Sequence, residues 1–335
     1  MINTVSLSVV VPCYNTGLAL QELYRRTCAA CHQVTGTDYE IIFVDDGSAD
    51  DTWPLIKALA QHDPHIVSVR LSRNYGHQMA LTAGLSLVRG DLVLIMDDDL
   101  QDPPELLAPM HTLLRDTSAD VVYGQRRTRM GETYFKTTTS ALFYWLLSKI
   151  TDLDIPLNTG DFRLVTRRVA DILVQMPERD RFIRGMVAWL GFRQVPFLYD
   201  RQARFAGTTH YTLRKLVSFA TDALISFSIL PLRIATYVGA LLAVVLLVVG
   251  AYALISWKVY ALVPGWTSLT LLIAGTSSAQ LLALGVIGEY IGRIYLQTKL
   301  RPLFLIAEID QPHVATAVEP RRPQTNMRGD DRSQG

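Results

Sequence analysis

The sequence predicts an α/β protein: a front domain built on a Rossmann-like, mostly parallel sheet, followed by a C-terminal hairpin of two apolar helices. Three observations predict this class. Apolar runs alternate with amphipathic runs over about the first 125 residues, which is typical of parallel strands joined by helices. Polar and acidic residues follow the ends of the apolar runs. Near the C-terminus, residues 234–257 and 259–288 contain no charged side chain.

The elements of the front domain follow from these patterns in chain order. Strands are expected at 6–11, 39–45, 66–71, 92–96 and 121–124. Helices are expected at 18–31, 51–61, 76–88 and 179–192, where apolar residues recur at helical spacing. Residues 135–150 predict a helix that either lies at a membrane interface or packs on the core. The run 92–96 is apolar throughout, so we expect a strand buried on both faces.

Composition limits the location and the partners of the chain. It has 335 residues, 49% of them hydrophobic, and a formal net charge of +1, which argues against a nucleic-acid partner because such proteins normally carry a basic face. Three cysteines fit a reducing compartment without structural disulfides. The N-terminus lacks a basic region followed by an apolar one, so we expect no signal peptide and a cytoplasmic front domain.

Three consecutive carboxylates, Asp97, Asp98 and Asp99, follow the predicted strand 92–96. Adjacent carboxylates in a partly desolvated cleft repel one another, so a compensating cation is expected there. Oxygen ligands from Asp97, Asp99 and Gln101 suit Mg²⁺ or Mn²⁺, with a substrate diphosphate completing the coordination. The alternative is a solvated acidic turn that caps the helix beginning near Pro104.

Other polar groups are expected at the same edge of the sheet. Pro12, Tyr14 and Asn15 follow the first strand, and Asp46 follows the second, where it can accept a hydrogen bond from a base or a ribose. A dinucleotide-binding domain is disfavoured because no Gly-x-Gly-x-x-Gly turn follows the first strand and because Pro12 and Tyr14 would obstruct a pyrophosphate.

Four motifs carry a family resemblance. They are Val11-Pro12-x-Tyr14-Asn15, Val44-Asp45-Asp46-Gly47-Ser48-x-Asp50-x-Thr52, Arg73-Asn74-x-Gly76 and Asp97-x-Asp99-Leu100-Gln101-Asp102-Pro103-Pro104-Glu105. As a set they resemble the family 2 glycosyltransferases with the GT-A fold, within them the polyprenyl-phosphate sugar transferases, and most closely the bactoprenol glucosyltransferases. The likeness runs from about residue 5 to residue 308.

The resemblance implies a nucleotide-sugar donor, with Asp46 on the uracil and a divalent metal among Asp97, Asp99 and Gln101. The donor-binding residues expected from it are Pro12, Tyr14, Asn15, Asp46, Gly76, Asp97 and Asp98. The chain departs from many relatives at Thr16-Gly17, where they have an acidic residue after Tyr-Asn. A contact from that position to the donor is therefore in doubt.

The segment 159–164 contains the motif Gly160-Asp161-Phe162-Arg163, with Gly160 permitting a tight turn. The resemblance assigns catalysis to Asp161, together with Asp99 as a metal ligand. Asp161 could accept a proton, orient the acceptor or hold a sugar hydroxyl, and a structural ion pair with Arg163 is the alternative. Residues 178–185 also match the bactoprenol branch.

The acceptor phosphate is expected to meet positive side chains, because planar guanidinium groups bind phosphate well. The candidates are Arg126 in the basic cluster 125–129, Arg163, Arg204 and His210. The alternative for the cluster 125–129 is a mobile, solvated loop that binds no phosphate. His210 stands where relatives commonly have Lys, and an ordinary loop residue is an equal alternative.

The C-terminal region is predicted to attach the protein to a membrane. We divide the chain into a GT-A domain at 1–211, a juxtamembrane amphipathic helix at 212–232, a transmembrane hairpin at 233–293 with spans of about 234–257 and 266–290, and a tail at 294–335 that is disordered after about 308. Positive residues flank both outer ends of the hairpin, which places both termini and the front domain in the cytoplasm, at the inner membrane. Glycines give the hairpin small faces that could pack between subunits, so a homo-oligomer is an open alternative.

The function expected from this set is inverting transfer of a hexose, glucose from UDP-glucose first, to undecaprenyl phosphate. Such a lipid-linked sugar would serve later glycan or O-antigen modification. Alternatives are the same reaction with UDP-N-acetylhexosamine, UDP-aminoarabinose or GDP-mannose as donor. A processive polysaccharide synthase is less favoured, because the chain has no Gln-x-x-Arg-Trp signature and too few spans for a channel. A non-catalytic membrane scaffold is also less favoured, since the acidic motifs are intact.

Overall fold

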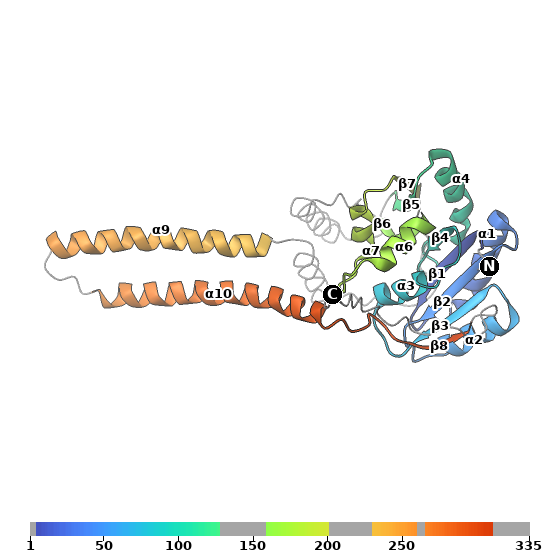
Figure 1. Ribbon diagram of the computed structural model, residues 1–335, viewed down its shortest axis with the longest axis horizontal. Coiled ribbons are helices and arrows are strands. Elements are labelled where there is room, and N and C mark those ends of the chain that lie inside the picture. The colour runs from blue at the N-terminus through green and yellow to red at the C-terminus, as the bar shows by residue number, and fades with distance from the viewer. Residues whose placement is uncertain (1–4, 128–158, 201–229, 260–264, 311–335) are drawn as a thin grey trace, which may run out of the picture.

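The protein consists of a layered α/β domain and a long helical hairpin that extends away from it (Figure 1). This computed structural model describes residues 5–127, 159–200, 230–259 and 265–310. The predicted helices at 135–150 and 213–227 lie outside these residues. So does most of the predicted juxtamembrane segment 212–232.

One eight-stranded sheet forms the centre of the domain, in the order β7-β5-β6-β4-β1-β2-β3-β8. Its strands are β1 Leu7–Cys13, β2 Tyr39–Asp45, β3 Ile66–Leu71, β4 Leu92–Ile95, β5 Val121–Arg126, β6 Thr159–Thr166, β7 Gln194–Tyr199 and β8 Ile306–Asp310. The pairs β1/β2, β1/β4, β2/β3 and β5/β7 are parallel, whereas β4/β6, β5/β6 and β3/β8 are antiparallel. The expected GT-A-like α/β sheet is confirmed, and it is mixed.

Helices cover both faces of the sheet (Figure 1). They are α1 Leu20–Thr35, α2 Thr52–His62, α3 His77–Leu85, α4 Leu107–Thr117 after the 3₁₀ turn η1 Pro104–Leu106, α6 Arg167–Gln175 and α7 Ile183–Trp189. Side chains of β1 alternate between the two cores: Val9 and Val11 pack with α1 and α4, and Val10 packs with α3 and α6. The central strands are therefore apolar on both faces, as the sequence of 92–96 predicts.

Two differences from the sequence prediction lie near the residues of the motif 160–163 and the segment 178–185. Gly160 lies within strand β6 rather than in a tight turn; a Cβ there would come within 2.9 Å of an Arg126 guanidinium nitrogen, so the glycine allows that side chain to approach. The helix expected at 179–192 is shorter, at Ile183–Trp189. Arg181 lies outside it and donates to the carbonyl oxygen of Leu173 at the end of α6 (2.8 Å).

Strand β8 was not predicted from the sequence. It follows the hairpin and pairs antiparallel with β3, placing Glu308 opposite Arg70. Glu308 also lies 3.1 Å from the Lys57 ammonium on α2. Residues 306–310 therefore form an edge strand of the sheet. They lie in the region where the sequence predicts a tail.

The hairpin consists of α9 Leu230–Val259 and α10 Trp266–Thr298, which run side by side (Figure 1). Arg293, near the end of α10, pairs with Asp180 of the front domain at 2.9 Å. Within the part of the chain that the structure describes, neither helix combines the length and the apolar character that a membrane crossing requires. The predicted transmembrane hairpin is thus not supported by the structure.

Candidate active site

The candidate site lies at one edge of the sheet, where strand ends bring polar residues together. Because β1, β2 and β4 are parallel, their carboxyl ends meet at the same edge, with Asp46 following β2 and Asp97 lying two residues after β4. Strand β6 runs antiparallel to β4, so its amino-terminal part delivers Asp161 to that edge. This is the convergence of Asp46 and the Asp97 run that the sequence predicts.

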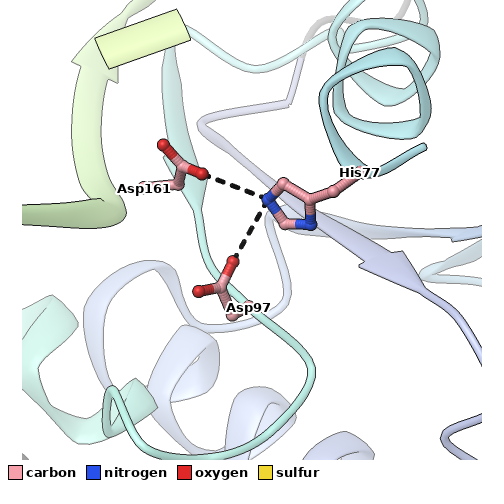
Figure 2. Close-up of side chains that lie close together, drawn as sticks. All are labelled: His77, Asp97 and Asp161. Atoms are coloured by element: carbon pink, nitrogen blue, oxygen red, sulfur yellow. Dashed lines mark hydrogen bonds and ion pairs between the residues drawn. The ribbon is translucent and has the colours of Figure 1, made fainter. Parts of the chain in front are cut away.

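Figure 2 shows His77 pointing between two carboxylates that come from different elements. The His77 Nε2 atom lies 3.1 Å from Asp161 Oδ2 and 3.4 Å from Asp97 Oδ1. One ligand atom of each residue lies within 4.8 Å of the other two. His77 is the first residue of α3, Asp97 follows β4, and Asp161 lies in β6. This group has the ligand types and the spacing to hold a divalent cation.

Charge and burial strongly perturb the three groups. Burial would lower the pKa of His77, but hydrogen bonding to Asp161 and the charges of Asp97 and Asp98 outweigh it and raise this pKa to about 9. Burial and the neighbouring carboxylates Asp161 and Asp102 raise the pKa of Asp97, against the opposing effect of His77. An imidazole must be neutral to bind a metal, so a cation in this group would displace the His77 proton.

Asp161 is almost fully buried and accepts hydrogen bonds from several donors. Arg184 binds both of its oxygens, with Nε 2.8 Å from Oδ1 and Nη2 3.3 Å from Oδ2. The Gln78 side-chain amide donates to Oδ2 at 3.1 Å. Burial alone would raise the pKa of Asp161, but Arg184 and His77 hold it well below the usual carboxyl range. The carboxylate is therefore ionised and a weak base.

On the donor side, Asp46 shapes the loop that leads into α3. Its two carboxylate oxygens accept the backbone N–H groups of Tyr75 (2.7 Å) and Gly76 (2.8 Å). Gly76 has φ 94°, a left-handed conformation that favours glycine. Asp46 and Gly76, both predicted donor-binding residues, thus contact each other, and His77 is the next residue in the chain.

The middle carboxylate of the acidic run, Asp98, contacts the loop after β1. Asp98 accepts the backbone N–H of Tyr14 (3.3 Å) and the Thr16 hydroxyl. The hydroxyl of Thr16, where the resemblance leads us to expect an acidic residue, therefore contacts Asp98. The Asn15 side-chain oxygen accepts the backbone N–H of Ala49 (2.9 Å), and Tyr14 is 51% exposed.

Comparisons with known proteins agree with this geometry. Residues 8–173 match the family model described as Glycosyl transferase family 2. A glycosyltransferase of Synechocystis sp. is 41% identical over 307 residues, which are 91% of this chain and 96% of that protein. The chain belongs to glycosyl transferase family 2. This family 2 glycosyltransferase is also 41% identical over 309 residues to the glycosyltransferase YkcC of Bacillus subtilis, covering 90% of this chain and 93% of that protein. The bactoprenol glucosyl transferase of Shigella phage SfX is 38% identical over 301 residues, covering 90% of this chain and 98% of that protein.

The predicted metal ligands of the glycosyltransferase are only partly brought together. Among the described residues, the group at 4.8 Å spacing contains Asp97 but not Asp99. Asp99 instead accepts the backbone N–H of Gln101 through Oδ1 at 3.1 Å. His77 takes part in the group although the sequence analysis did not select it.

The predicted phosphate-binding residues have different outcomes in the described structure. Arg126 lies 3.6 Å from the buried carboxylate of Asp102 and 3.4 Å from the Tyr199 hydroxyl, which in turn donates to Asp102. Arg163 is buried and donates to the carbonyl oxygen of Gly160 (3.0 Å). Arg204 and His210 lie outside the described residues.

The guanidinium partner of Asp161 is Arg184, so the alternative of an Asp161–Arg163 ion pair is wrong. Sequence reasoning also missed His77, Gln78 and Arg184 as site residues. A signal was present for each, because His77 and Gln78 directly follow the Arg73-Asn74-x-Gly76 motif and Arg184 lies in the segment 178–185 that resembles the bactoprenol branch.

Proposed function

We propose that this glycosyltransferase transfers glucose from UDP-glucose, with inversion, to undecaprenyl phosphate or a related polyprenyl phosphate. The observation that carries the proposal is the similarity to proteins named bactoprenol glucosyl transferase. Those from Shigella phages SfX and SfV are 38% and 37% identical over 90% of this chain, and at least 97% of their own lengths is covered. A polyprenyl phosphate acceptor and a glucosyl donor fit those names.

A divalent cation, Mg²⁺ or Mn²⁺, is proposed at Asp97. Asp97 Oδ1 is buried and accepts no hydrogen bond in the described structure, although His77 Nε2 lies 3.4 Å away as an ion-pair partner. A metal that displaces the His77 proton could bind this oxygen. His77 and Asp161 are the neighbours that would share the cation, with Asp99 and Gln101 as the further candidates from the sequence. When bound, the cation would supply Lewis-acid stabilisation of the departing nucleotide diphosphate.

The charge state of Asp161 supports a positioning role over a role as general base. An acceptor phosphate has a second pKa of about 6, so it is already largely ionised at neutral pH and needs little proton abstraction. The main task is to hold two anions close together. Asp161 orients His77 and Arg184, and Arg126, Arg163, Arg204 and His210 remain the proposed phosphate-binding residues.

We also propose that the hairpin of α9 and α10 attaches the protein to the inner membrane, with the catalytic domain and both termini on the cytoplasmic side. Support comes from large apolar side chains that α10 leaves exposed, among them Leu282 (74%) and Ile294 (60%). Such a hairpin would bring the active site to the lipid acceptor. Resistance of the full chain to alkaline carbonate extraction, with release by detergent, tests the attachment.

The experiment that tests the function offers a panel of radiolabelled nucleotide sugars to the full-length enzyme in membranes with undecaprenyl phosphate. We expect a lipid product from UDP-glucose that chelation abolishes and Mn²⁺ or Mg²⁺ restores. Transfer from UDP-N-acetylhexosamine, UDP-aminoarabinose or GDP-mannose, and not from UDP-glucose, would assign that nucleotide sugar as the donor. A polymer would indicate a processive synthase, and no transfer from any donor would indicate a scaffold.

Asp161→Asn tests the residue assignment in the same assay. We expect turnover to fall by roughly 100-fold or more and the KM for UDP-glucose to change far less, because the described hydrogen bonds of Asp161 go to His77, Gln78 and Arg184 and not to Asp46. Near-normal transfer by the purified variant would remove Asp161 from the mechanism.

A further inference from the structure

Gln78 links the two helices that supply the donors of Asp161. It is the second residue of α3, directly after His77. Its side-chain nitrogen donates to Asp161 Oδ2 at 3.1 Å, and its side-chain oxygen accepts the backbone N–H of Ile183 at 2.9 Å. Ile183 is the first residue of α7, and the next residue is Arg184.

The chemistry of these two contacts fits an uncharged amide of this length. Ionised Asp161 can only accept a hydrogen bond, and the Ile183 N–H can only donate one. The amide satisfies both at once, with its nitrogen toward the carboxylate and its oxygen toward the backbone, and the reverse orientation would satisfy neither. A glutamate would keep the contact to Ile183 but would set a second negative charge against Asp161.

The bridge also controls a second donor of Asp161. The first N–H groups of a helix have no partner within the helix, and Gln78 supplies one for α7. The adjacent Arg184 binds both oxygens of Asp161 and donates to the carbonyl oxygen of Thr159 at 3.2 Å. The start of α7 and the head of β6 are therefore fixed relative to one another.

We propose that Gln78 is a positioning residue that holds the Asp161 carboxylate and the Arg184 guanidinium in the geometry required for sugar transfer. This inference rests on the proposed function, in which Asp161 serves that transfer. Gln78 acts through Asp161, because its described side-chain contacts are to Asp161 and to the backbone of Ile183.

The test is a double-mutant cycle on the full-length enzyme in membranes, with UDP-glucose, undecaprenyl phosphate and Mn²⁺. We expect Gln78→Glu to lower kcat by roughly 10- to 100-fold, the scale of a misplaced catalytic group, with less than about a twofold change in the KM for UDP-glucose. In an Asp161→Asn background the same substitution should lower kcat by less than about twofold, because groups acting as a unit are not additive.

Two further variants separate positioning from a general loss of structure. Gln78→Met removes both contacts without adding a charge, so it should also lower kcat. Gln194→Met is the matched control: Gln194 donates to the carbonyl oxygen of Val187 on α7 at 2.9 Å, away from Asp161, and its loss should leave kcat unchanged.

The outcomes distinguish this inference from the function on which it rests. Full additivity of Gln78→Glu and Asp161→Asn, or a Gln78→Glu enzyme with wild-type kcat, would overturn the positioning role while leaving the function in place. A wild-type enzyme that transfers no sugar would overturn the proposed function and the inference with it. An Asp161→Asn enzyme with near-normal transfer would remove Asp161 from the mechanism and overturn the inference, while the function would stay in place. A Gln194→Met enzyme as slow as Gln78→Met would assign the effect to α7 stability and overturn the inference.

Discussion

Replacing Glu40 by Gln should destabilise the domain without touching the active site. Glu40 lies in β2 and is 1% exposed. Its Oε1 atom accepts the Ser8 hydroxyl (2.6 Å) and the Arg89 backbone N–H (2.7 Å), and its Oε2 atom accepts the Arg89 Nε–H (2.7 Å). Glutamine has the same size but only one acceptor oxygen. It must therefore turn its NH₂ group against either the guanidinium or the pair formed by Ser8 and the Arg89 N–H.

The magnitude follows from these contacts. A hydrogen bond to a charged group contributes about 1.5–3 kcal/mol, and on either side of Glu40 at least one such bond is lost and donors are left facing donors. Arg89 is 22% exposed, so water compensates part of the loss at the guanidinium. The lost bond and the facing donors lower the free energy of unfolding, and hydration of Arg89 offsets part of that decrease. We expect a net decrease of about 3 kcal/mol in the free energy of unfolding. For a domain of this size that corresponds to a decrease of about 6–12 °C in Tm.

The assay is thermal unfolding of the full chain in detergent, followed by tryptophan fluorescence, because Trp53 is buried in the domain. Glu22→Gln is the matched control: Glu22 forms an exposed pair with Arg25 at 2.7 Å, and its loss should leave Tm unchanged. If Glu40→Gln unfolded at the same temperature as the control, the buried network would not stabilise the domain. The kcat of Glu40→Gln at 25 °C should equal that of the wild type.

Three further predictions concern other parts of the domain. Tyr199→Phe removes the hydroxyl that donates to buried Asp102 and should lower the free energy of unfolding by about 1–3 kcal/mol in urea titrations; an unchanged midpoint would contradict it. Gly84→Ala would place a Cβ 2.3 Å from Val10 Cγ1, so the packing of α3 on β1 should lose about 1–3 kcal/mol in the same measurement, and a wild-type midpoint would show that the site relaxes freely. Burial raises the pKa of Cys28 to about 11, so its thiolate is scarce at pH 7.5 and iodoacetamide should label it far more slowly than a free thiol, with the rate rising as pH approaches that pKa; rapid labelling at pH 7.5 would refute the burial.

The sequence was most informative where local composition decides the structure. Strands β2 and β3 begin and end at the predicted residues, because both faces of each are buried and the apolar runs end at polar residues. The parallel order of the first strands then places Asp46 and Asp97 at one edge, so that part of the site could be predicted as well.

The partners of those residues could not be predicted, because the contacts join distant segments. Asp161 meets His77 across 84 residues and Arg184 across 23, and the choice of Arg184 over nearby Arg163 depends on where α7 begins. Local spacing holds no information on that position. Strand β8 was missed for a related reason: a run of five residues is too short a pattern to identify an edge strand.

The pairing of β3 with β8 determines how late in synthesis this edge of the sheet can be completed. The ribosome completes Ile306–Asp310 only after both long helices, so β3 leaves the exit tunnel with one row of backbone hydrogen-bonding groups uncovered. The strand that covers this edge of β3 is β8, which follows α10 in the described chain. A chain released before residue 306 would therefore present an open β-edge, and we expect such fragments to associate through it.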